Sequence, residues 1–185
     1  MALWGALGAV VGLPLFALAV LRGVVAVDGA VLGPLPWWSP LLSAAAGAVC
    51  MGVHAGIVRP LTRGFFGAAL PAATSGGAGF ALLQFAAVAA GCMLLGTPRQ
   101  AVSVAVVLLV ASLALTARGA RAALVLQMLG VALLGTAAAL GALALGAEVY
   151  AKDALWGVPL WVPAVAAHAG VASHVVDRWL VTEIG

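Results

Sequence analysis

Three histidines and one aspartate are the residues of this chain best suited to acid–base chemistry in apolar surroundings. His54 lies near the end of one long apolar stretch, and His168, His174 and Asp177 lie in another. His174 and Asp177 are three residues apart, which places them on one face of a helix. His54 and His174 each precede an arginine by about one helical turn, so the two histidines are predicted to lie at a similar depth.

An ionisable group inside a membrane span is costly unless it has a partner, and histidine titrates near neutral pH. One hypothesis is that His54, His174 and Asp177 converge inside the protein to relay protons, bind a cation or contact a polar headgroup. The alternative is that Asp177 and Arg178 form an interfacial cap that reaches into the headgroups. The sequence favours the cap for that pair and leaves His54 and His174 evenly divided. His168 lies deeper and is expected to face the interior.

Two more polar residues belong to the candidate site. Thr74 lies in ATSGGAG, a Gly-rich break that would expose backbone groups to an ion or solute if it lined a cavity. The simpler interpretation, which we favour, is that a Ser or Thr here caps the next helix. Gln84 lies near mid-membrane and is expected to face another helix. The candidate polar site is therefore His54, His168, His174, Asp177, Thr74 and Gln84, with no catalytic role assigned.

No motif in the chain assigns a cofactor. Two histidines at equal depth on different helices would ligate a haem only if their rings faced each other with room between them. Neither the HExxH pattern of zinc enzymes nor the GxSxG elbow of hydrolases occurs. We predict no metal site, and the cofactor and enzymatic activity stay open.

Composition decides the class of protein. Of 185 residues, 65% are hydrophobic and 7% are charged, whereas a soluble domain carries about 25% charged residues. Most of the surface must therefore face lipid, and 24 glycines indicate closely packed helices. The formal charge of +3 comes from scattered basic residues, so no nucleic-acid partner is expected.

Hydrophobic length predicts an all-α, multi-pass membrane bundle of about six helices with short loops, forming one domain over residues 1–185. The expected spans are residues 3–21, 40–58, 77–95, 101–116, 122–147 and 158–180, with a short interfacial segment at 65–70. Both termini are predicted to be cytoplasmic, because this orientation puts five basic residues inside and three outside. Trp37, Trp38, Trp156 and Trp161 would then form an aromatic belt on the outer side.

Two local patterns suggest how the helices are arranged. Asp28 precedes GAVLGPLPWWSP and Asp153 precedes ALWGVPLWVP, and each is followed by a span that ends in His and Arg. The first and last helix pairs would then be a parallel internal repeat. The patterns Gly8–Gly12 and Gly52–Gly56 would allow close helix contacts, with His54 pointing away from the face that its flanking glycines define.

Three classes of function fit this sequence. The first is a small transporter or channel-like protein that moves a small solute or ion past the candidate polar site. The second is a non-catalytic accessory subunit of a larger membrane complex. The third is a membrane-embedded enzyme, or a haem or quinone redox subunit, that uses the histidines. The expected partners are the lipid bilayer and either other membrane subunits or further copies of the chain.

Overall fold

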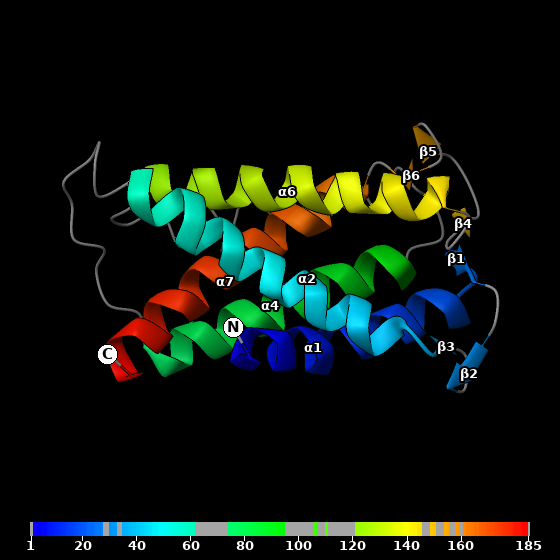
Figure 1. Ribbon diagram of the computed structural model, residues 1–185, viewed down its shortest axis with the longest axis horizontal. Helices are drawn as coiled ribbons and strands as arrows, with labels where there is room; N and C mark the ends of the chain where they lie inside the picture. The colour runs from blue at the N-terminus through cyan, green and yellow to red at the C-terminus, as the bar shows by residue number, and fades with distance from the viewer. Residues whose placement is uncertain are drawn as a thin grey trace.

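The computed structural model defines a helical bundle whose strands are only two or three residues long in the part of the chain that is described (Figure 1). The described residues are 2–27, 30–32, 35–61, 74–94, 106, 110, 121–145, 149–150, 154–155, 158–159 and 161–184. The fourth predicted span, residues 101–116, lies outside them except for Val106 and Val110, and so does the interfacial segment predicted at 65–70.

Long helices make up the bundle: α1 (Ala2–Leu21), α2 (Ser39–Val53), α4 (Ser75–Leu94), α6 (Arg121–Ala144) and α7 (Trp161–Ile184). A π-helical turn, η1 (His54–Val58), continues α2, and the helical run extends to Leu61. Among the described residues, three stretches are long and apolar enough to cross a membrane, at Ser39–Leu61, Ser75–Leu94 and Ala123–Ala144. The predicted all-α membrane bundle is therefore confirmed.

Helix α7 lies at the centre of the described bundle. It packs along both α6 and α4 and also contacts α2, while α1 packs along α2. It has more buried residues than any other described helix, and it carries two histidines and an aspartate among them. Of the eight buried polar residues in the described part of the chain, four lie on this enclosed helix, where they are kept from lipid: His168, Ser173, His174 and Asp177.

Short strands connect the helices and repeat in the same order. They are β1 (Val25–Ala26), β2 (Ala30–Leu32) and β3 (Leu35–Pro36) between α1 and α2, and β4 (Val149–Tyr150), β5 (Ala154–Leu155) and β6 (Val158–Pro159) between α6 and α7. In each set the second and third strands form a hairpin. The first strands, β1 and β4, pair with each other in antiparallel register.

This arrangement supports the internal repeat that the sequence suggests. Each half is a helix, a strand, a hairpin and a second helix, and both sets of strands lie at the same end of the bundle (Figure 1). Helices α2 and α7 hold equivalent places in the two halves and contact each other. His54 and His174, which lie on these two helices, therefore come from corresponding parts of the repeat.

Glycines allow close contact at some of the predicted positions. A Cβ atom at Gly8 would collide with the carbonyl oxygen of Ser43 and lie 2.9 Å from Gly47 Cα, so this glycine permits α1 to touch α2. At Gly52 and Gly56 a Cβ atom would meet nothing within 4 Å in the described part of the chain. The first GxxxG pattern thus marks a helix contact, whereas the second faces away from the helices described.

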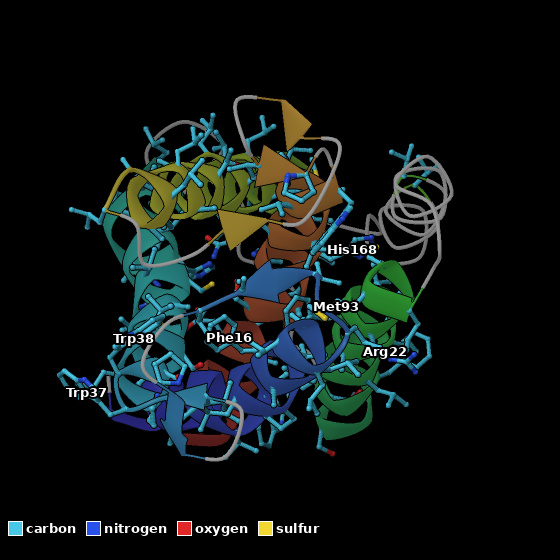
Figure 2. The ribbon with its side chains drawn as sticks, turned by 90° about the vertical axis from the view of Figure 1, so that its right-hand side faces the viewer. Phe16, Arg22, Trp37, Trp38, Met93 and His168 are labelled. Carbon is cyan, nitrogen blue, oxygen red and sulfur yellow. The ribbon has the colours of Figure 1, made fainter. Side chains whose placement is uncertain are left out.

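The tryptophans at the strand end of the bundle differ in exposure. Trp37 projects outward, whereas the ring of Trp38 lies 6.0 Å from that of Phe16 (Figure 2). Trp161 is buried against Val88 and Cys92. The prediction of Trp161 as a belt residue is therefore wrong, because this ring fills the space between α7 and α4.

Candidate functional site

Charged and aromatic side chains from α2 and α7 meet inside the bundle. His54 Nε2 lies 2.7 Å from Asp177 Oδ2, and Arg59 Nη2 lies 3.5 Å from the same oxygen. The rings of His54 and His174 are packed together, with centroids 5.4 Å apart. We call His54, Arg59, His174 and Asp177 the polar cluster. Its two histidines and its aspartate are buried, with at most 2% of each residue exposed.

Asp177 is buried, so the prediction that it forms part of an interfacial cap is wrong. Its carboxylate does not reach headgroups, because it points between α7 and α2 and pairs with His54 and Arg59. An isolated carboxylate would be very costly in such a place, and a histidine and an arginine on the facing helix offset that cost. Counting residues along α7 could not reveal this, because the partners come from a helix more than a hundred residues earlier.

A second polar contact joins the same helices through α6. Gln127 Nε2 donates to the backbone oxygen of Cys50 on α2 and to Ser173 Oγ on α7, both over 2.9 Å. The Ser173 hydroxyl in turn donates to the carbonyl oxygen of Gly170. Gln127 is fully buried, and its Oε1 accepts no hydrogen bond from the described residues. We expected Gln84 to face another helix. In the structure, Gln127 is a glutamine whose side chain links three helices.

The other candidate residues lie apart from the polar cluster. Thr74 is exposed, and its Oγ1 accepts a hydrogen bond from the Gly77 amide over 3.1 Å, so it caps the start of α4 as favoured above. Gln84 is partly buried in α4. His168 is buried on the side of α7 that faces α4, away from α2 (Figure 2). The structure therefore brings together His54, His174 and Asp177, and not all six predicted residues.

The geometry of the polar cluster does not suit a haem held by His54 and His174. Ring centroids 5.4 Å apart are those of rings in direct contact, so no space separates them for a porphyrin. The Nε2 atom of His54 is also engaged by Asp177. Among the described residues, no group of three or more His, Cys, Asp or Glu side chains is placed to hold a metal ion.

A cavity of about 240 Å³ lies beside the polar cluster, between α1, α2, α4 and α7. Nearly all of its wall is apolar, and its few polar atoms include the hydroxyls of Ser43 and Ser173. The apolar wall includes Leu7, Val11, Phe16, Leu42, Leu82 and Phe85. None of the six candidate residues lines this cavity. The sequence did not predict this cavity, because its wall is assembled from residues on four separate helices.

The cavity and the polar cluster both lie along α2 and α7, but different residues form them. Cys50 and Ser173 border the cavity, and each is about one turn from a member of the polar cluster. Gln127, on α6, is hydrogen-bonded to both residues, through the Cys50 carbonyl and the Ser173 hydroxyl. The hydrogen bonds of Gln127 therefore lie between the cavity and the polar cluster.

The fold has counterparts among solved structures. No protein-family model and no curated protein matches the chain. The crystal structure of MvINS, a mycobacterial Insig homologue from Mycobacterium vanbaalenii, is similar with a TM-score of 0.79 and 16% identity, over 99% of this chain and 94% of that one. A crystal structure of a cross-linked MvINS trimer is similar with the same values. At this identity, the likeness shows a shared fold. Together with the apolar helices long enough to cross a membrane, it supports an integral membrane protein.

Proposed function

We propose that this integral membrane protein binds an apolar molecule, such as one chain of a lipid, in the cavity between α1, α2, α4 and α7. The observation that carries the proposal is a cavity of about 240 Å³ with an almost wholly apolar wall. Among the described residues of that wall, Ser43 and Ser173 carry hydroxyls, which are neutral groups. The space therefore matches an uncharged, flexible apolar group better than an ion.

Physical chemistry favours occupation of such a space. Protein interiors are close-packed, and their few voids are usually too small for a ligand. An apolar cavity of about 150 Å³ in another protein stays free of water and binds benzene. In this chain the cavity is larger, and the wall offers a hydrocarbon chain the dispersion contacts that an empty space lacks. Binding would then be driven by packing and not by charge.

Transport of a small solute or ion, the function given first place from the sequence, receives less support. Such a path needs hydrated polar groups around an open space, and the cavity has an apolar wall instead. Asp177, the acidic member of the polar cluster, is paired with His54 and Arg59. We therefore place binding of an apolar molecule before transport.

Association with further copies of the chain is a second proposal. It is supported by the likeness to MvINS, a protein that has been crystallised as a cross-linked trimer. Apolar side chains on the outer face of α6, including Leu129, Leu133 and Leu134, offer a surface for such contact. Cross-linking of the protein in native membranes tests this, with a ladder of multiples expected and a lone monomer band contradicting it.

The binding proposal is tested by filling the cavity. Ala46 lines it, whereas its neighbour Ala45 does not, and both residues are exposed positions of α2. We expect Ala46→Phe to reduce binding of deuterated oleyl alcohol, measured by native mass spectrometry of the protein in mild detergent. The matched control Ala45→Phe adds the same ring outside the cavity and should bind as the parent does. Equal binding by all three proteins would exclude this cavity as the site.

A further inference from the structure

The helical run from Ser39 to Leu61 contains a turn of unusual geometry next to the polar cluster. At η1 the backbone N–H of Arg59 donates to the carbonyl oxygen of His54, five residues earlier. A regular α-helix makes this bond over four residues. Single π-helical turns inside α-helices are rare, and many lie at functional sites. This one begins with a member of the polar cluster and is followed directly by another.

The π-helical turn decides which side chains face Asp177. In a regular α-helix, residues five apart differ in direction by about 140°, so His54 and Arg59 would point to different sides. One extra residue in the turn relates them as residues four apart, within about 40° of each other. Both side chains then reach one carboxylate oxygen, over 2.7 Å and 3.5 Å.

We propose that α2 with η1 is a two-state element whose π-helical turn is held by the pairing of Asp177 with both His54 and Arg59. Without that pairing, the turn relaxes to regular α-helix. The part of the helix beyond it, from Arg59 to Leu61, then rotates by about 100° around the axis. This inference concerns the end of α2 and does not depend on what occupies the cavity.

Packing around the turn shows what such a rotation would change. Val58 is fully buried and packs in one cluster with Val53, Ala123 and Val131. The Arg59 side chain is 33% exposed and runs from the end of the helix to the buried carboxylate. Rotation would withdraw Arg59 from Asp177 and shift Val58 within its cluster. The residues of α2 that line the cavity precede the turn and would keep their direction.

The turn can be shortened to give a locked reference protein. Gly56 is exposed within η1, and a Cβ atom there would meet nothing within 4 Å among the described residues. Deleting Gly56 removes the extra residue, so a regular α-helix then brings both His54 and Arg59 to Asp177. Gly56→Ala keeps the chain length and serves as the matched control for the change at this position.

The test compares Asp177→Asn in the full-length chain and in the chain that lacks Gly56. A spin label at Leu61→Cys, with Cys50 and Cys92 replaced by Ala, reports collisions with oxygen and with a nickel chelate in lipid nanodiscs. We expect Asp177→Asn to change both collision rates in the full-length chain and in the Gly56→Ala control. In the shortened chain the collision rates should stay unchanged. Its helix is already regular without the extra residue, so loss of the pairing causes no rotation.

Two results would overturn the inference. One is a folded full-length Asp177→Asn protein whose label is unchanged, and the other is an equal change in the shortened chain. If Asp177→Asn prevents folding, Arg59→Gln takes its place, because it removes one of the two pairings. The same label is then compared in the full-length and the shortened chain. Elution as a single species and helical circular dichroism establish that each variant is folded before the label is read.

Discussion

The polar cluster and the apolar cavity lie along the same two helices and differ in almost every physical respect. Where α2 and α7 carry His54, Arg59, His174 and Asp177, the helices are joined by a shared carboxylate and by two rings in tilted contact. Where they carry small residues such as Ala46, Ala169 and Ala172, a space remains. In a membrane, polar side chains connect helices, and small residues decide whether helices touch or leave room.

Substitutions in the polar cluster and in the cavity wall should also differ in how much they change the free energy of unfolding. A buried charge that loses its partner pays the full desolvation penalty, so changes in the polar cluster should be severe. A cavity wall that gains or loses a methyl group changes only packing, so the loss of stability there should be smaller. Three further substitutions, each with a matched comparison, test this contrast, taken from the largest expected effect to the smallest.

The largest effect is expected from Asp177→Ala. This change leaves the buried His54 and the partly exposed Arg59 without their shared carboxylate. Breaking a buried pair in this way costs about 3–5 kcal/mol. The loss is measured as the free energy of unfolding in mixed micelles of increasing dodecyl sulfate content.

Arg59→Gln provides the matched comparison for Asp177→Ala. The Arg59 side chain is 33% exposed and its contact is 3.5 Å long. Exposed pairs contribute about 1 kcal/mol or less, so this variant should lose much less stability. Equal losses in the two variants would show that the stability of the polar cluster does not depend mainly on the buried carboxylate.

An intermediate effect is expected from Gly8→Ala. The added Cβ would collide with backbone atoms of Ser43 and Gly47, so α1 must move away from α2. Overpacking of this kind costs about 1–3 kcal/mol, and it would also reshape the cavity, which Gly8 lines. Unfolding in mixed micelles and binding of oleyl alcohol should therefore both change.

Gly52→Ala is the control for Gly8→Ala, because the new methyl group would have nothing within 4 Å of it in the described residues. Its stability should be equal to or slightly above that of the parent, since alanine favours helix by about 1 kcal/mol over glycine. A loss at Gly52 as large as that at Gly8 would contradict the contact between α1 and α2.

The smallest effect is expected from Gln127→Leu, at the boundary between the two regions. The change removes hydrogen bonds to the Cys50 carbonyl and to Ser173 and keeps a side chain of similar size. Hydrogen bonds between membrane helices contribute roughly 1 kcal/mol, so the unfolding free energy should fall by about that amount. Thr136→Val is the control, because Thr136 donates within its own helix to Ala132. If both variants unfold alike, Gln127 does not connect the helices.

Much of this fold could be predicted from the chain. Low charge and apolar length give the membrane bundle, and the predicted spans at 3–21, 40–58, 77–95, 122–147 and 158–180 match α1, α2 with η1, α4, α6 and α7 within a few residues at most ends. The equal depth of His54 and His174 also led to the expectation that they converge, and their rings are in contact. Depth follows directly from counting residues along a helix.

Direction around the helix axis was much harder to predict than depth. A regular helical wheel separates Arg59 from His54, and nothing in HAGIV indicates the extra residue in the turn that brings them together. Asp177 was expected at the interface because it lies near the end of its own helix. Its partners lie on a helix far away in the sequence, so the pairing that buries it could not be predicted. The cavity depends on four helices at once. Local sequence rules describe one helix at a time, so such features need the packed structure.

One measurement tests the binding proposal most directly, namely the positions labelled by a diazirine-bearing hexadecanol in the intact protein in native-like membranes. After irradiation, mass spectrometry of peptides locates each attached probe. We expect saturable labelling at cavity residues such as Phe16, Ala46 and Phe85, with loss of that labelling in Ala46→Phe. Labelling confined to outward-facing residues such as Leu133, with no saturable component, would contradict it.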